Sequence, residues 1–168
     1  AIRYYKDEFL SMAGGKKGAT RPYKVAVTAP CLEACPAKLD IPGYIELIRN
    51  NKFGESLNLI RKRCILPGVI GRACTHPCEE ACVRGGIDKT LAIRLLKRAA
   101  ADNDLAAGAS TLKKPEAERS EKVAIVGAGP AGLAAAYHLR RMGYQVTIFE
   151  AFPKGGGMAA VGISRGMK

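Results

Sequence analysis

Five of the six cysteines gather in two short segments, and these segments constrain the fold more than any other feature of the chain. The first is CLEAC at residues 31–35, and the second is CTHPCEEAC at residues 74–82. Cysteines recur every four residues within both, which places them along one face wherever the chain is helical. Clustered thiols are typical of a metal site, whereas disulfide frameworks belong to small secreted chains. We therefore expect the two segments to converge on one inorganic centre.

The second segment predicts a short helix that begins next to a proline. Pro77 stands directly before Cys78, and helices tolerate proline at their first position. We expect Cys74 to approach from a loop, and Cys78 and Cys82 to share one face of the helix. Tetrahedral zinc and an iron-sulfur cluster both accept four thiolates, but structural zinc usually uses Cys-x2-Cys pairs, so the Cys-x3-Cys spacing favours iron and sulfide. The candidate metal ligands are Cys31, Cys35, Cys74, Cys78 and Cys82.

Four other residues near these segments each have two interpretations. His76 could be a zinc ligand, although a lone histidine beside a proline is more typical of a surface or supporting position. Cys64 lies outside both segments; we favour a buried structural thiol over a replacement ligand. Lys97 and Arg98 could offset the charge of a cluster or could be solvated side chains.

The front half predicts a small all-helical domain over residues 25–102. Two amphipathic helices are expected between the cysteine segments, the first capped by Asp40 and the second following Gly54. Residues 65–72, ILPGVIGR, predict a loop because of their proline and glycines. Asp88 is the expected N-cap of a third helix. Such a small domain buries little apolar surface, so a bound cluster would supply much of its folding free energy.

The character of the sequence changes after residues 103–120, which are rich in small and polar residues and predict a linker. The following stretch, KVAIVGAGPAGLAAAYHLRRMGYQVTIFE, predicts a strand, a glycine turn, an Ala-rich helix and a second strand. Residues 121–168 therefore correspond to one βαβ unit of a Rossmann-type domain. One unit cannot complete the sheet.

The glycine turn matches the dinucleotide fingerprint Gly-x-Gly-x-x-Gly. Gly127 permits the tight turn, Gly129 lets the backbone approach a pyrophosphate, and Gly132 allows close packing of the helix. Glu150 ends the second strand, where an acidic residue hydrogen-bonds the ribose of FAD or NAD. The candidate nucleotide-binding residues are Gly127, Gly129, Pro130, Ala131, Gly132 and Glu150.

The chain carries a net charge of +12, which raises the question of nucleic acid. Aromatic residues make up only 6% and the basic residues are dispersed, so we expect no nucleic-acid binding. The basic groups suit an anionic cluster, flavin phosphates or an acidic partner. There is no run of about 18 apolar residues and no apolar secretory core, so we expect no membrane insertion and a cytoplasmic location.

These motifs together resemble the small subunit of NADPH-type glutamate synthase and the N-terminal region of dihydropyrimidine dehydrogenase. The similarity covers about residues 25–165 and includes both cysteine segments and the glycine fingerprint in the same order. It implies a helical iron-sulfur domain followed by an FAD domain and, in full-length members, an NAD(P)H domain. It further implies that electrons pass between nicotinamide, FAD, clusters and partner subunits that carry redox centres.

The resemblance also implies a division of ligands. Members with two clusters have two additional upstream cysteines, where this chain has Tyr23 and Ala26. The counterparts of Cys31 and Cys82 serve one cluster in those members. In those members the counterparts of Cys35, Cys74 and Cys78 hold the other cluster, together with a polar residue from the next helix.

We expect one 4Fe-4S cluster in this chain, although two clusters are possible. The expected ligands are Cys35, Cys74, Cys78 and either Cys31 or Cys82.

The predicted function is electron transfer within an FAD- and iron-sulfur-dependent NAD(P)H oxidoreductase subunit. No side chain is an evident catalytic acid, base or nucleophile, and these residues alone are expected to be inactive. One alternative is a non-catalytic zinc-binding adaptor or assembly subunit of a larger complex; another is a zinc module that binds nucleic acid. Residues 1–24 predict a basic arm that either wraps a neighbouring subunit or forms a tail.

Overall fold

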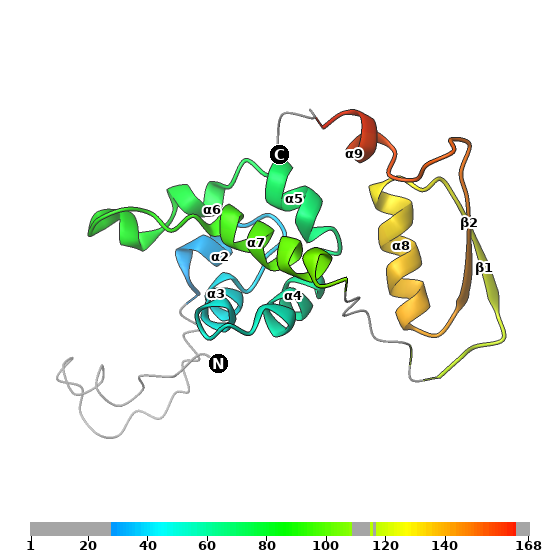
Figure 1. Cartoon of the computed structure of the whole chain (residues 1–168), viewed down its shortest axis with the longest axis horizontal. Helices are drawn as coiled ribbons and strands as arrows, with labels where there is room; N and C mark the ends of the chain where they lie inside the picture. The colour runs from blue at the N-terminus through cyan, green and yellow to red at the C-terminus, as the bar shows by residue number, and fades with distance from the viewer. Residues whose placement is uncertain (1–27, 109–114, 116, 164–168) are drawn as a thin grey trace, which may run out of the picture.

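The computed structural model describes residues 28–108, 115 and 117–163, and within them the expected order of a helical unit and a βαβ unit is confirmed (Figure 1). The arm expected at residues 1–24 lies outside the described residues. None of the described helices is both long and apolar enough to cross a bilayer. The helical unit contains α2 (Pro30–Ala34), α3 (Ile41–Arg49), α4 (Phe53–Arg61), α5 (Pro67–Ala73), α6 (Pro77–Glu80), the 3-10 helix η1 (Val83–Gly86) and α7 (Ile93–Ala106).

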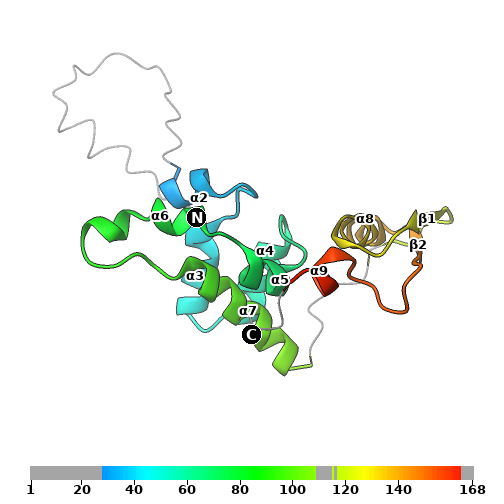
Figure 2. The ribbon, with the colours of Figure 1, turned by 90° about the horizontal axis from the view of Figure 1, so that it is seen from above.

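Helix α3 begins as the sequence predicts. Asp40 is its N-cap, and the carboxylate accepts a hydrogen bond from the Gly43 backbone N–H at 3.0 Å. The apolar stripe of α3 packs on α4, and α7 packs on both α4 and α5 (Figure 2). The core of this unit holds three of the cysteines among its aliphatic residues: Cys35, Leu39, Ile41, Tyr44, Ile60, Cys64, Cys78, Ile93 and Ala100.

The expectation of a loop at residues 65–72 is wrong, because residues 67–73 form helix α5. Pro67 occupies the first turn, where a missing N–H costs nothing. Gly71 serves close helix packing instead of a turn, since a Cβ there would stand 2.9 Å from the Cα of Arg98 on α7. The glycine thus lets α5 and α7 approach each other next to Cys74.

The expected cap of the third helix is also wrong. Helix α7 begins at Ile93, and Asp88 instead pairs with Arg84 at 2.7 Å in the preceding turn. The Arg84 bonds hold the pKa of Asp88 down at about 2. At its other end α7 continues to Ala106, so residues 103–106, expected in the linker, are helical.

The second unit is a single βαβ crossover. Strand β1 (Lys122–Val126) pairs in parallel with β2 (Gln145–Phe149), with Val123 opposite Val146, and α8 (Pro130–Arg141) joins them. A short helix, α9 (Met158–Val161), follows. Figure 1 shows α8 lying along one side of the two strands. This is the strand-turn-helix-strand order that the fingerprint predicts.

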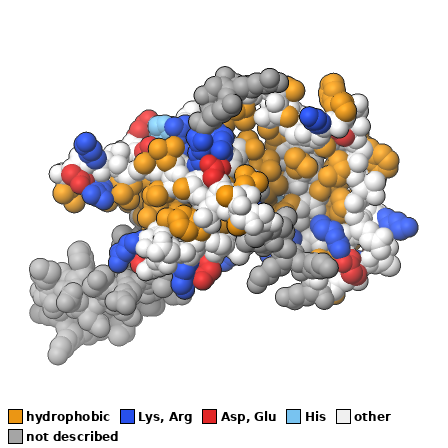
Figure 3. Space-filling model, in the orientation of Figure 1, with side chains coloured by type: hydrophobic (Ala, Val, Ile, Leu, Met, Phe, Trp, Pro, Cys, Tyr) orange, Lys and Arg blue, Asp and Glu red, His pale blue; other side chains and the backbone are white. Residues whose placement is uncertain are grey.

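The βαβ unit leaves large apolar side chains exposed. Val126 is 91% exposed and Phe149 is 57% exposed, at the ends of the two strands. Hydrophobic side chains are visible over this unit in the space-filling view (Figure 3). In a full Rossmann domain, further strands and helices cover such surfaces. The exposure of these apolar side chains is consistent with the expected single βαβ unit of a Rossmann-type domain.

An ion pair joins α4 to α7, and we expect it to matter for stability. Arg61 Nη2 lies 2.9 Å from Asp104 Oδ2, and the side chains are only 15% and 11% exposed. Because Asp104→Ala removes a carboxylate that is hydrogen-bonded to a largely buried guanidinium, we expect it to lower the free energy of unfolding by about 2 kcal/mol. Arg49→Ala, which breaks an exposed pair with Glu46, should cost under about 1 kcal/mol. Urea unfolding followed by circular dichroism measures both; equal losses would contradict the prediction.

Candidate cluster site and nucleotide loop

Three of the predicted ligands line one pocket in the helical unit. Cys35 follows the end of α2, Cys74 follows the end of α5, and Cys78 lies in the first turn of α6. The two cysteine segments, distant in sequence, thus meet as expected. The pocket wall also includes Tyr44, His76, Arg94 and Lys97.

The chain between Cys74 and Cys78 forms a tight turn. Cys74 has extended backbone, and His76 has a left-handed conformation with φ of 52°. The His76 backbone N–H is thereby directed at the sulfur of Cys74, with an N to Sγ distance of 3.3 Å. Pro77 then starts α6 as the sequence predicts. The turn brings Cys74 to the pocket from a loop and Cys78 from a helix.

The expectation that Cys82 shares a helix face with Cys78 is wrong. Helix α6 ends at Glu80, and Cys82 has extended backbone beyond it. The segment after Ala81 turns away into η1, so four-residue spacing no longer implies one face. Cys82 lies instead near Cys31. Burial is the main cause of the raised pKa of the Cys31 thiol, and the nearby charges of Cys82 and Cys35 raise this pKa further.

The surroundings of Cys78 disfavour its thiolate form. Burial raises the pKa of Cys78 to about 11, and the neighbouring charges of Cys35 and Cys74 act in the same direction. Burial likewise raises the pKa of Tyr44, with further contributions from Cys78, Cys35 and Cys31. Cys35, Cys74 and Cys78 therefore lie close enough together that thiolate charges on them would repel. A cationic iron centre relieves this repulsion because it binds thiolates directly.

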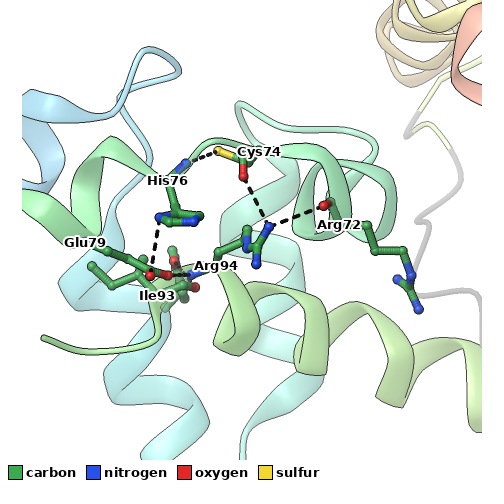
Figure 4. A network of polar contacts seen from close by, with 7 residues as sticks. Arg72, Cys74, His76, Glu79, Ile93 and Arg94 are labelled. Carbon is green, nitrogen blue, oxygen red and sulfur yellow. Dashed lines mark hydrogen bonds and ion pairs between the residues drawn. The ribbon is translucent and has the colours of Figure 1, made fainter. Parts of the chain in front are cut away.

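A polar network that the sequence did not indicate supports the Cys74 turn (Figure 4). The Arg94 guanidinium donates to the carbonyl oxygens of Arg72 and Cys74, each at 3.4 Å. The Glu79 carboxylate accepts from the backbone N–H of Arg94 at 2.8 Å and lies 3.5 Å from His76 Nδ1. Glu79 thereby takes the capping role at the start of α7 that was expected of Asp88. Arg94 precedes Lys97 by three residues, a spacing that places both on one helix face.

Cys64, Lys97 and Arg98 each have different surroundings. Cys64 is 9% exposed but is not part of the pocket wall, and burial raises its pKa although the charge of Lys97 opposes this. This environment fits a buried structural thiol. Arg98 forms an ion pair with Asp102 at 3.1 Å, whereas Lys97 is 5% exposed and lines the cysteine pocket.

The cysteine set fits an iron-sulfur cluster by its chemistry. All six cysteines are free, and the converging donors are thiols, which are the ordinary ligands of such clusters. Within the described ranges, no three or more His, Cys, Asp or Glu side chains are grouped around the position of one metal ion. A four-iron cluster binds each thiolate to a different iron, so its ligands stand farther apart than those of a single ion. The ligand roles of the five cysteines stay predictions.

The glycine loop of the βαβ unit has the geometry that the fingerprint requires. Gly127 has φ of +96°, a conformation that other residues rarely adopt. A Cβ at Gly132 would collide with the carbonyl oxygen of Gly127, so the start of α8 needs glycine there. A Cβ at Gly129 would meet no atom within 4 Å, and its φ of −73° is ordinary. Since nothing within the described chain requires glycine at 129, the open space there suits the approach of a ligand.

Glu150 lies beside this loop, as its place in the fingerprint predicts. Its carboxylate accepts hydrogen bonds from the backbone N–H of Ala128 at 2.7 Å and of Phe152 at 3.0 Å. The bonds from Phe152 and then Ala128 lower its pKa, so the group is anionic at neutral pH. Pro130 and Ala131 form the first turn of α8, directly after Gly129. The six predicted nucleotide-binding residues therefore gather in one region.

A cysteine pocket in a helical unit, followed by a glycine-loop βαβ unit, defines a class of proteins that join an iron-sulfur domain to a nucleotide-binding domain. Comparison with protein families agrees. Residues 7–109 match the family described as dihydropyrimidine dehydrogenase domain II, 4Fe-4S cluster, and residues 125–164 match the NAD(P)-binding Rossmann-like domain. The chain belongs to the first of these families, which confirms the resemblance.

Similar proteins include subunits of several oxidoreductases. The chain is 46% identical over 97% of its length to the NADPH-Fe(3+) oxidoreductase subunit beta of Geobacter sulfurreducens, and 48% identical over 94% to the NADP(+)-dependent formate dehydrogenase subunit beta of Moorella thermoacetica. It is 39% identical over 80% of its length to the NAD-dependent dihydropyrimidine dehydrogenase subunit PreT of Salmonella typhimurium. The chain spans 25% of each of the first two relatives and 33% of the third.

Proposed function

We propose that this chain passes electrons between a flavin and a partner subunit by way of one 4Fe-4S cluster. The observation that carries the proposal is the shared pocket of Cys35, Cys74 and Cys78, which come from the two separate cysteine segments. The family to which the chain belongs is described by the same cofactor. FAD is the proposed ligand of the glycine loop, with NAD(P)H bound elsewhere in the full-length protein.

For the fourth ligand we propose Cys31. Cys31 packs against the hydrophobic core that contains Cys35 and Cys78, and the charge of Cys35 contributes to the raised pKa of the Cys31 thiol. Cys31 is thus close to the pocket cysteines. Cys82 lies near Cys31, since its charge also contributes to the raised pKa of Cys31.

The names of the relatives delimit the reaction. They share a nicotinamide cofactor and differ in the second substrate, which is iron(III), formate or a dihydropyrimidine. This chain would therefore contribute the step that these reactions have in common, in which a flavin that has been reduced by the nicotinamide passes electrons to the next redox centre. We propose that the partner is an oxidoreductase subunit that carries such a centre, and that the complex is cytoplasmic because the thiols must remain reduced.

The residues of the site prepare it for one-electron transfer. When bound, the cluster accepts and releases single electrons. Tyr44 lines the pocket and donates a hydrogen bond to the carbonyl of Ile93 at 3.2 Å, which fixes the orientation of its hydroxyl. The His76 backbone N–H bonds to the sulfur of Cys74, and such bonds raise the reduction potential of clusters. Arg94 holds the carbonyl of Cys74 and so orients the loop.

Metal analysis of anaerobically purified protein tests the proposal. We expect about four iron and four sulfide per chain, a brown colour, and an electron paramagnetic resonance signal after reduction with dithionite. A colourless protein with one zinc per chain would favour a zinc-binding adaptor. In the native polypeptide that contains this sequence, reduction of the cluster by NADPH or NADH alone would show that a flavin feeds it.

A further inference from the structure

Lys97 is a buried cation without a carboxylate partner among the described residues. It is 5% exposed on α7, and lysine is almost never buried to this degree unless it is paired. In the part of the chain that the structure describes, none of the ion pairs or hydrogen bonds involves the Lys97 ammonium. The next residue, Arg98, lies on the same helix and is paired with Asp102. Burial of an unpaired ammonium costs free energy, so an anion is needed nearby.

The groups around Lys97 include several sulfur atoms. Lys97 lines the same pocket as Cys35, Cys74 and Cys78, and, although burial raises the pKa of the Cys64 thiol, the charge of Lys97 acts to lower it. Arg94, the second cationic residue of the pocket wall, donates hydrogen bonds to two backbone carbonyls. Lys97 is therefore the pocket cation whose charge the described residues leave unbalanced.

We propose that Lys97 is the counter-ion of the iron-sulfur cluster and raises its reduction potential. This proposal rests on the proposed function. A cluster with four thiolate ligands is anionic, and reduction adds one further negative charge. A fixed positive charge in a dry pocket stabilises the reduced form more than the oxidised form. Lys97 is a positioning and tuning residue: it binds no iron, and it sets how readily the cluster accepts an electron from the flavin.

The test compares two neighbouring cations of one helix. Lys97→Met removes the charge in the pocket and keeps the length of the side chain. Arg98→Met removes a charge that lies outside the pocket and is paired with Asp102. The midpoint potential is measured by anaerobic redox titration followed by electron paramagnetic resonance. We expect Lys97→Met to shift the ratio of reduced to oxidised cluster at least fivefold toward oxidised, which is about 40 mV for one electron. Arg98→Met should change the ratio less than twofold.

Each outcome decides the question. An unchanged potential in Lys97→Met, with iron content as in the wild type, would overturn the proposal. If Lys97→Met loses the cluster, Lys97→Arg provides the second test. Retention of iron in Lys97→Arg would support the proposal that the pocket needs a positive charge. Loss of iron in Lys97→Arg would overturn the proposal and indicate that the shape of the lysine side chain matters instead. Absence of iron from the wild-type protein would instead refute the proposed function.

Discussion

The Cys78→Ala variant is expected to lose nearly all of its iron and sulfide, together with its brown colour. Cys78 is a proposed ligand in the first turn of α6, and the other two cysteines of the pocket wall are proposed ligands as well. Because we expect a bound cluster to supply much of the folding free energy of the small helical unit, the helical signal in circular dichroism should fall at the same time. Iron and sulfide analysis after anaerobic purification measures the first effect.

Cys64→Ala is the matched control for this result. Cys64 is 9% exposed and Cys78 is 7% exposed, so the two substitutions remove the same atoms from similarly buried positions. Since Cys64 lies outside the pocket wall, its variant should keep the full iron content and lose about 1 kcal/mol of stability. If both variants lost iron equally, Cys64 would belong to the ligand set; if neither did, Cys78 would be removed from it.

The features that the sequence predicted well depend on local signals. The fingerprint around Gly127 contains the turn, the helix start and the order of both strands within one short stretch, and the structure has all of them. Asp40 likewise caps α3 through a bond to the third residue after it. Such features need no knowledge of what packs against them, so a single sequence is enough to predict them.

The features that it predicted wrongly depend on distant contacts. From the sequence alone, Gly71 is typical of a loop. In the structure it lies in a helix, where the absence of a side chain lets α7 pack closely. The buried face of α7 also depends on what packs against it: Ile93, Lys97, Ala100 and Ala101 are buried, whereas Leu95 is 50% exposed. Once that face is known, a lysine lies in the pocket and an arginine outside it, a distinction that composition and spacing could not make.

Gly129→Ala and Gly132→Ala are both expected to reduce FAD binding at least about tenfold in the native polypeptide, but for different reasons. Alanine at 132 would clash with the Gly127 carbonyl and distort the start of α8. It should therefore lower the unfolding temperature as well as the flavin content. Alanine at 129 meets no atom of the described chain, so its methyl group can act only on a ligand that approaches the loop.

The unfolding temperature of the flavin-free form separates these two causes. Gly129→Ala should match the wild type there, and so should Gly86→Ala, a glycine in η1 whose added Cβ also meets no atom within 4 Å. Flavin absorbance after purification then gives the binding effect, which Gly86→Ala should lack. Normal flavin content in Gly129→Ala would mean that the pyrophosphate does not pass over this residue. The open space at Gly129 would then need another ligand, and Glu150, held against the same loop by Ala128, would lose its proposed ribose.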